Sequence, residues 1–398
     1  MKDPIQQTQQ QIEKKRTRKR KQFIPRIGCF KIEDDYPTSL THGGFSMEME
    51  SDANGQSCEP THLVVMVNGI IGSAADWKYT AKQFLIRYPH DIVVHCSERN
   101  SSMMTFDGVD IMGERLAEEV TSLVNHRPKL QKISFVAHSL GGLVARYAIG
   151  RLYRENITKE PDEGNGDCAP EGSRNPIVLE KLKGKIAGLE PINFITIASP
   201  HLGSRGHKQF PAVGTLRILE KLAHNTSWML SKTGRHLMLT DKKNGKPPLL
   251  LRMVNDSEDL KFMSALHSFR RRVAYANSRF DFVVGWRTAS IRRKNELPKL
   301  ERGPKDNKYP HIVNVEPPKT SRFDEDVTLE DKVKKPKTSE MEEFMIKCLT
   351  RVGWERVDVS FRGSRQRFFA HNTIQVKSPW MNSDGADVIL HVIDHFLL

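Results

Sequence analysis

The chain has 398 residues, of which 38% are hydrophobic, and its 62 Lys and Arg against 48 Asp and Glu give a formal net charge of +14. This apolar content suffices for one elaborated α/β domain or for two domains. We find no run of about eighteen apolar residues that would span a membrane, and the N-terminus lacks the apolar stretch of a signal peptide.

The five cysteines are odd in number and lack the spacing of metal ligands. Reduced thiols in a cytosolic compartment are therefore the simplest expectation, and we expect no metal. The cysteines are Cys29, Cys58, Cys96, Cys168 and Cys348.

Residues 1–60 read as a disordered basic tail and linker, because they are polar and show no hydrophobic periodicity. Seven positive residues are concentrated between Lys14 and Lys21. Such a run is typical of a solvated tail, a nuclear address, or peripheral contact with an anionic membrane. The sequence shows no RNA-binding motif, no paired zinc ligands and no basic helix with heptads, so we expect no specific nucleic-acid partner. The oligomeric state is left open.

From residue 61 the pattern alternates between apolar strands and helical segments, which predicts a mostly parallel sheet with helices on both faces. The last helix is predicted over 387–397, with His391 and His395 on its surface; a His pair at i, i+4 can bind metal, but a third ligand is missing. The candidate strands are 62–67, 91–96, 132–137, 192–198, 272–277 and 366–370.

The strand 62–67 turns sharply out of the sheet at Asn68 to Gly72. In hydrolases with a nucleophile elbow, the loop after an early strand supplies one oxyanion N–H, which makes Ile70 the candidate donor. Gly69 would allow close backbone approach.

The segment 132–143 carries the strongest signal, because an apolar strand runs into Ser139 and then into a helix. Ala137 and Gly141 provide the small residues that a nucleophile elbow requires two places either side of its serine. The N–H of Leu140, at the helix N-terminus, would then face a developing oxyanion. The alternative is a buried serine that caps a helix.

Four segments resemble the lipase-like serine esterases of plants and fungi, a branch of the α/β-hydrolase superfamily: VVMVNGIIGSAADW, VAHSLGGLVARYAIGRLY, IASPHLGSRG and FFAHNTIQV…DGADVILHVIDHFL. The resemblance covers most of residues 60–398 and implies an α/β-hydrolase fold. Two departures are Asn68 in place of the usual His of the oxyanion loop, and Ala137 in place of the first glycine of the elbow. Because the oxyanion contact is made by backbone N–H groups, neither departure removes it.

Three segments interrupt the predicted hydrolase domain of residues 61–398. A Gly- and Pro-rich loop covers about 154–178. The segment 200–270 lies where such hydrolases insert a cap or lid, after the sixth core strand. Its apolar residues either pack in the core or form a lid that opens on lipid; they include Trp228, Met229 and Leu230. A polar insertion is predicted over 286–364.

The remaining catalytic partners follow from chain order, since hydrolases with this elbow place the acid after the nucleophile and the histidine last. Asp281 follows a strand by a short loop, and Asp256 and Asp259 are its rivals. His371 ends the candidate strand 366–370 and is favoured over His311 in the polar insertion and over His391 and His395 on the last helix. His138 is interpreted as a residue that packs the elbow, and His201 as a structural or cap-hinge residue.

The expected function is hydrolysis of carboxylic esters through Ser139, His371 and Asp281, without a cofactor. The resemblance implies a glycerolipid substrate, and soluble esters and acyl thioesters remain alternatives. A third possibility is a non-catalytic scaffold on a hydrolase fold. We expect a cytoplasmic protein. Contact with a membrane surface and entry into the nucleus, each through the basic run Lys14–Lys21, are the alternatives.

Overall fold

The structure is a computed structural model that describes residues 38–41, 44–47, 59–155, 184–204, 231–300, 308–320, 323 and 337–398. Residues Pro37–Leu398 form one compact unit. The basic run Lys14–Lys21, most of the predicted loop 154–178, and the apolar residues Trp228, Met229 and Leu230 lie outside the described residues.

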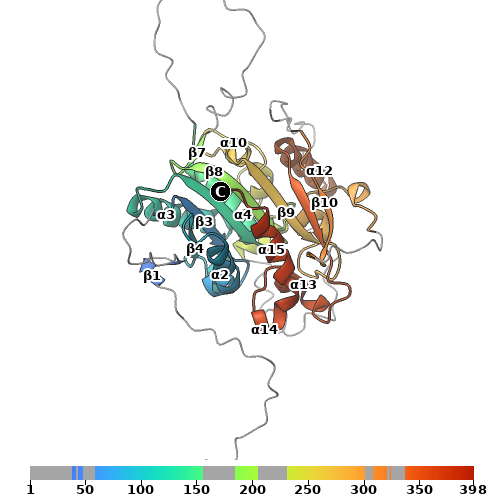
Figure 1. Cartoon of the computed structure of the whole chain (residues 1–398). Coiled ribbons are helices and arrows are strands. Elements are labelled where there is room, and N and C mark those ends of the chain that lie inside the picture. The colour runs from blue at the N-terminus through green and yellow to red at the C-terminus, as the bar shows by residue number, and fades with distance from the viewer. Residues whose placement is uncertain are drawn as a thin grey trace, which may run out of the picture. The chain divides into compact units, whose positions relative to one another are not determined.

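The core of the fold is a nine-stranded sheet in the order β1-β2-β4-β3-β5-β8-β9-β11-β10 (Figure 1). The six strands from β4 to β11 are parallel, whereas β1, β2 and β10 pair antiparallel at the two edges. The strands are β1 Thr38–Thr41, β2 Gly44–Met47, β3 His62–Val67, β4 Ile92–Ser97, β5 Lys132–His138, β8 Glu190–Ile197, β9 Arg271–Asn277, β10 Ile312–Glu316 and β11 Glu355–Val359. A separate pair joins β6 Tyr153–Arg154 to β7 Lys185–Ile186.

Both faces of the sheet are covered, because the residues of the central strands β3 and β5 are buried at nearly every position rather than at alternate ones. Alternate residues of β3 (Leu63, Val65 and Val67) pack with the helices of one face, namely α3 Val109–His126, α4 Gly141–Leu152 and α10 Phe262–Ser268. On the other face lie α2 Lys78–Arg87 and α15 Ala386–Asp394, which contact one another (Figure 1). The sheet therefore forms the middle of a three-layer α/β fold.

Apart from α12, which has 12 residues, the other helices are short. The α-helices are α8 Lys232–Leu237, α9 Leu249–Arg252, α11 Trp286–Ser290, α12 Thr338–Leu349, α13 Ala370–Thr373 and α14 Pro379–Asn382. The 3-10 helices are η1 Ala74–Trp77, η2 Ser102–Phe106, η3 Lys294–Glu296, η4 Thr350–Val352, η5 Arg367–Phe369 and η6 Ser383–Gly385.

Five of the six candidate strands are confirmed, with ends within two residues of the prediction: β3, β4, β5, β8 and β9. The sixth, 366–370, is wrong, because this segment forms η5 and the start of α13. Its Phe368 and Phe369 are exposed rather than buried in a sheet. The aromatic residues of this segment suggested a strand, but they are not buried against a neighbouring layer.

The predicted polar insertion 286–364 is also corrected, since it contains β10 and β11 of the main sheet. The charged residues of β11 explain the error. Arg356 binds Glu316, and Asp358, which is fully buried, binds Arg292. Because these charges are paired inside the fold, a strand that looks polar in sequence forms part of the core.

The sheet also extends toward the N-terminus, into the range predicted as tail and linker. β1 and β2 lie within residues 1–60, and β2 pairs with β4 in the main sheet. The prediction that nothing regular precedes residue 61 is therefore wrong for these two strands.

The described part of the predicted cap segment 200–270 packs into the main core. Leu237 of α8, Leu250 of α9 and Phe262 of α10 are buried in the same cluster as the central strands. For these helices the apolar residues are ordinary packing.

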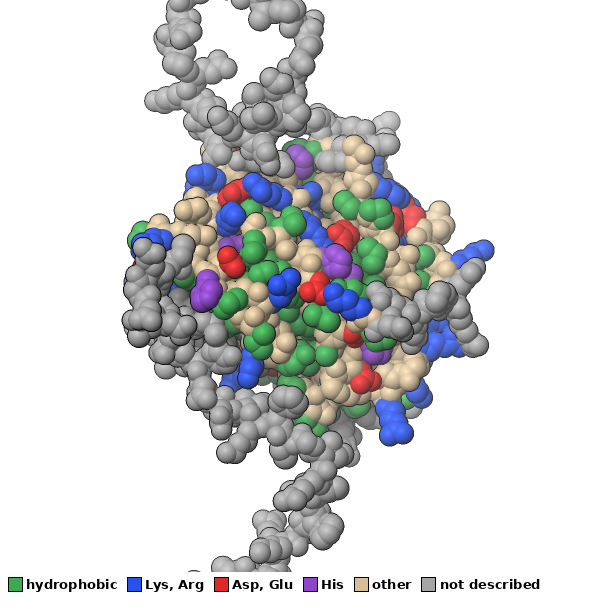
Figure 2. Space-filling view, in the orientation of Figure 1, with side chains coloured by type: hydrophobic (Ala, Val, Ile, Leu, Met, Phe, Trp, Pro, Cys, Tyr) green, Lys and Arg blue, Asp and Glu red, His purple; other side chains and the backbone are tan. Residues whose placement is uncertain are grey.

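No helix among the described residues is long and apolar enough to cross a membrane. In the view of Figure 2, which looks onto the face that carries α2 and α15, hydrophobic side chains are interspersed with acidic and basic ones.

Candidate active site

Ser139 lies at the turn between β5 and α4, where the backbone adopts a left-handed conformation with φ of 53°. Such a φ is uncommon outside glycine and marks a constrained turn. A Cβ on Gly141 would lie 2.4 Å from the carbonyl oxygen of Val67, so the turn tolerates no larger residue there. The local geometry is that of a nucleophile elbow.

The loop after β3 comes into close contact with the elbow. A Cβ on Gly69 would lie 2.9 Å from the Cβ of Ser139, which explains why a glycine is needed at this position. Asn68 shapes the loop through its side-chain amide, which donates to the carbonyl oxygens of Gly69 and Asn100 at 3.1 and 2.9 Å. The residue that departs from the family pattern thus stabilises the loop.

The two predicted oxyanion donors flank this contact. Within the part of the chain that the structure describes, the backbone N–H groups of Ile70 and Leu140 donate no hydrogen bond, whereas Ile71 N–H donates to Thr105 Oγ1 at 3.0 Å. Leu140 also begins the turn into α4, where the helix dipole is positive. Both amides are therefore available to an anionic oxygen.

His371 lies on the short helix α13, between the serine and the aspartate. Its Nε2 is 3.0 Å from Ser139 Oγ, and its Nδ1 is 3.0 Å from Asp281 Oδ2. The histidine was predicted at the end of a strand; it is instead on a helix that follows β11 and η5. The structure nevertheless brings all three predicted residues into one hydrogen-bonded chain.

Asp281 follows β9 after a short loop and is buried. Its Oδ1 accepts from the N–H groups of Val283 and Val284 at 3.0 and 2.8 Å, and its Oδ2 accepts from Asn277 Nδ2 at 2.9 Å. Burial would raise the pKa of Asp281, but the charge of His371 and the hydrogen bonds from His371, Val284 and Asn277 outweigh it, and the pKa is lowered. The carboxylate is thus held ionised beside the imidazole.

Two residues hold the site together: Asn277, which the sequence did not assign to it, and His138, which was interpreted as a residue that packs the elbow. The amide of Asn277 bridges Asp281 Oδ2 and the carbonyl oxygen of Ala370, at 2.9 and 3.2 Å, and so joins the acid to the helix of the base. His138 Nε2 is 2.7 Å from the carbonyl oxygen of His371. Their sequence signal is weak, because both contacts connect residues that are far apart in the chain.

The rival residues lie elsewhere. Asp256 accepts from the N–H groups of Met263 and Ser264 at the start of α10. His311 binds Asp387, 2.9 Å away. His391, which was predicted on the surface, is buried, and its Nδ1 lies 2.8 Å from the hydroxyl of Tyr275. His201 is buried beside Trp354 and lies 3.0 Å from Thr196 Oγ1, as a structural residue would be.

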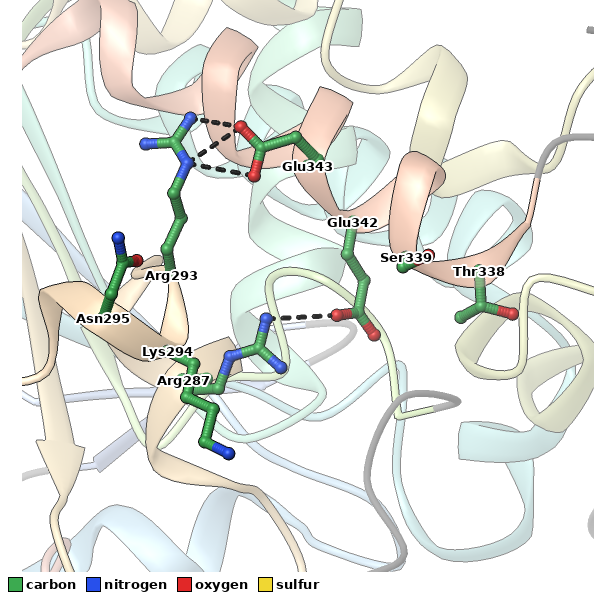
Figure 3. A pocket seen from close by; sticks show the side chains of 8 residues that line it. All are labelled: Arg287, Arg293, Lys294, Asn295, Thr338, Ser339, Glu342 and Glu343. Carbon is green, nitrogen blue, oxygen red and sulfur yellow. Dashed lines mark hydrogen bonds and ion pairs between the residues drawn. The ribbon is translucent and has the colours of Figure 1, made fainter.

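A pocket of about 550 Å³ lies between the start of α12 and the segment that follows α11 (Figure 3). It contains none of the three residues above. Arg287 pairs with Glu342 across it at 3.4 Å, and Arg293 pairs with Glu343. Both arginines are thus paired with carboxylates of α12, and Lys294 also lines the pocket. The described residues contain no cluster of three His, Cys, Asp or Glu that would hold a metal ion.

The chain is similar to a known protein family and to several known proteins. The family described as "Putative serine esterase (DUF676)" matches residues 57–291. "Putative lipase ROG1" of Saccharomyces cerevisiae is 32% identical over 235 residues, covering 58% of this chain and 28% of that protein. "Putative lipase C4A8.10" of Schizosaccharomyces pombe is 27% identical over 241 residues, covering 58% of this chain and 26% of that protein. The match therefore spans less than a third of the length of these relatives.

Among solved structures, carboxyl esterase 2 of the fungus Tuber melanosporum aligns with 99% of this chain and 98% of its own, at 11% identity and a TM-score of 0.41.

Proposed function

The chain belongs to this serine esterase family, and we propose that it hydrolyses carboxylic esters with Ser139 as nucleophile, His371 as general base and Asp281 as the residue that orients the imidazole. The observation that carries the proposal is the continuous chain from Ser139 Oγ through His371 to Asp281, with both distances at 3.0 Å. A structural serine in a turn has no need of a histidine and a buried carboxylate behind it.

In the first half of the reaction, Ser139 Oγ attacks the ester carbonyl carbon while His371 Nε2 takes the hydroxyl proton. The bond between the carbonyl carbon and the alkoxy oxygen then breaks, and the imidazolium returns the proton to the leaving alcohol. In the second half, water attacks the acyl carbon while His371 Nε2 takes a proton from it; the bond between the acyl carbon and Ser139 Oγ then breaks, the imidazolium returns the proton to Oγ, and the carboxylic acid leaves. Asp281 stabilises the imidazolium that forms in each half.

The tetrahedral oxyanion would lie between the N–H groups of Ile70 and Leu140. The close approach of Gly69 to Ser139 supports this assignment, because it brings the Ile70 amide beside the elbow. A donor of this kind contributes about 3 kcal/mol to stabilisation of the transition state.

For the substrate we propose the acyl ester of a glycerolipid. The relatives described as putative lipases support this class. Soluble esters and acyl thioesters react through the same steps and form the second candidate class.

A fluorophosphonate probe tests the proposal, because it reacts with an activated serine and not with an ordinary one. We expect the full chain to be labelled and to release acid from a lipid ester, and Ser139→Ala to do neither while it keeps its unfolding midpoint. Alanine fits the elbow, since the change removes only the hydroxyl oxygen. Labelling that persists in Ser139→Ala would disprove the assignment, and a wild-type chain without labelling would favour a scaffold on the hydrolase fold.

A further inference from the structure

The segment from Ser364 to Asp384, which contains His371, carries an unusual set of exposed side chains. Phe368 and Phe369 are 57 and 49% exposed, and Trp380 is 82% exposed. In the part of the chain that the structure describes, these are the aromatic side chains that qualify as exposed. Large aromatic side chains are seldom left in water without a partner.

The two ends of this segment are joined, so that the aromatic residues are presented on one rigid unit. The amide of Gln366 donates to Ser383 Oγ at 3.0 Å and accepts from the N–H of Asp384 at 3.1 Å. Ser364 Oγ also donates to the carboxylate of Asp384. The unit therefore closes on itself around the helix that holds His371.

The same unit is fixed to the opposite side of the site. Lys377 forms an ion pair with Asp76 at 2.9 Å, and the amide of Gln375 donates to the carbonyl oxygen of Asp76 at 3.1 Å. Asp76 lies on η1, directly after the oxyanion loop. The exposed aromatic residues and the oxyanion loop are thus held in one frame.

A second exposed apolar group lies beside the oxyanion loop. Ile71 is 43% exposed, and Met103 and Met104 on η2 are 68 and 42% exposed. Two hydrogen bonds attach η2 to the loop, from Ile71 N–H to Thr105 Oγ1 and from Ser102 N–H to the carbonyl oxygen of Gly72, both at 3.0 Å. Two segments that flank Ser139 in the site, the segment of the base and the oxyanion loop, are therefore each connected to an exposed apolar group.

The charge of the unit indicates what it contacts. Residues 364–384 contain three basic residues, Arg365, Arg367 and Lys377, against one acidic residue, Asp384, and Arg362 lies just before the unit. Arg362 and Arg365 are exposed, while Arg367 stacks over Phe368 with its guanidinium 4.7 Å from the ring centre. Exposed aromatic residues next to exposed arginines suit an interface whose interior is apolar and whose surface is anionic.

We infer that this unit docks the folded domain on an anionic lipid surface, with Phe368, Phe369 and Trp380 inserted among the acyl chains and Arg362 and Arg365 at the headgroups. Because the base and the oxyanion loop are each connected to one of the exposed apolar groups, the docking places the Ser139 site against the lipid. The inference extends the proposed function to a lipid in a membrane, but binding is a separate property from turnover.

The test measures binding alone, in the full chain with Ser139→Ala, so that no substrate is consumed. Vesicles of phosphatidylcholine with phosphatidylglycerol are sedimented and the bound protein is quantified. We expect the triple variant Phe368→Ala, Phe369→Ala, Trp380→Ala to lower the partition coefficient at least about tenfold. The free energy gained by burying one aromatic side chain is larger than the free energy that corresponds to a tenfold change in binding. Arg362→Gln with Arg365→Gln should weaken binding to these vesicles and leave binding to pure phosphatidylcholine unchanged.

The matched control is Ile86→Ala. Ile86 is 55% exposed but lies on α2 near the start of β4, whereas Ser139 follows the carboxyl end of β5. This variant should bind like its parent, and circular dichroism should show that all variants are folded. Equal binding of the parent and the triple variant would overturn the inference, as would a parent that binds neither vesicle; either result would point to a protein partner or to residues outside the unit. Absence of ester hydrolysis in the wild-type chain would instead overturn the proposed function and leave this result standing.

Trp380 gives an independent signal. Its fluorescence should shift to the blue when vesicles are added, and Trp380→Phe should lose that shift while it keeps most of the binding. A shift that is the same with and without Trp380 would contradict insertion of this residue.

Discussion

The imidazole of His138 lies against that of His371, with ring centres 4.7 Å apart, and its Nε2 is 2.7 Å from the His371 carbonyl oxygen. Because a carbonyl oxygen only accepts, Nε2 must carry the proton. Burial, then the charge of His371, lower the pKa of His138 well below its ordinary value, so the ring stays neutral. A fixed neutral donor thus holds the backbone of the residue that we propose as the base.

We therefore expect His138→Ala to lower kcat about tenfold through loss of this hydrogen bond, with little change in KM. His371→Ala should lower kcat by several orders of magnitude, because members of a triad act as one unit. His138→Gln, which retains an N–H donor, should recover part of the loss. Steady-state kinetics with a short soluble ester distinguish the variants, and a His138→Ala enzyme as active as the wild type would show that the contact has no positioning role.

Asp281→Asn tests the orienting role of the carboxylate. The amide oxygen can still accept from Val283 and Val284, so the fold should persist, but the ionised partner of His371 Nδ1 is lost. We expect kcat to fall by about 10⁴-fold. The control is Asp256→Asn at the start of α10, which should retain most of the activity. If the two variants lost activity equally, the assignment of Asp281 as the acid would be wrong.

Gly69→Ala tests the oxyanion loop. The added methyl group would lie 2.9 Å from Ser139 Cβ and 3.3 Å from His138 Nδ1, so the loop or the elbow must move. We expect turnover to fall by about 10²-fold, the effect of a small misplacement of reacting groups. Asn68→Ala should act in the same direction by loosening the loop. Normal turnover in Gly69→Ala would place the oxyanion donors elsewhere.

The parts of this site that could be predicted from the sequence are those encoded locally. The strand, small residue, serine and glycine around Ser139 are contiguous, and their geometry follows from steric limits on a single turn. Asp281 and His371 could be proposed from chain order together with their places after predicted strands, although the strand before His371 was wrong. Their contact with Ser139 depends on the parallel register of β5, β9 and β11, and β11 was not predicted because Arg356 and Asp358 look like surface charges.

The supporting residues could not be predicted for a related reason. Asn277 and His138 act through contacts with the backbone at residues 370 and 371, more than ninety positions away in the chain. Every residue type has a backbone carbonyl, so the sequence does not show which carbonyl accepts a hydrogen bond. Such contacts emerge only when the sheet brings the carboxyl ends of its strands together at one edge.

Buried histidines should make the protein sensitive to acid. Burial, and to a lesser extent the charge of Lys132, lower the pKa of His62 from 6.5 to about 3, and burial is also the main cause that lowers the pKa of His391 to about 4. Below pH 6.5 the unfolded chain binds protons at these positions while the folded chain does not. The stability that these neutral rings contribute is therefore complete above pH 6.5 and is lost as the pH falls toward the folded values.

Each such histidine should reduce the free energy of unfolding by about 1.4 kcal/mol for every pH unit below 6.5. Urea unfolding at pH 7, 6 and 5 would measure the slope. His62→Gln should be less stable at pH 7, because Gln replaces a ring that contacts Ser134 Oγ at 2.8 Å, but its stability should depend less steeply on pH. The control His90→Gln changes an exposed histidine and should keep the full slope. An identical slope in His62→Gln and the wild type would mean that His62 is already accessible to protons in the folded protein.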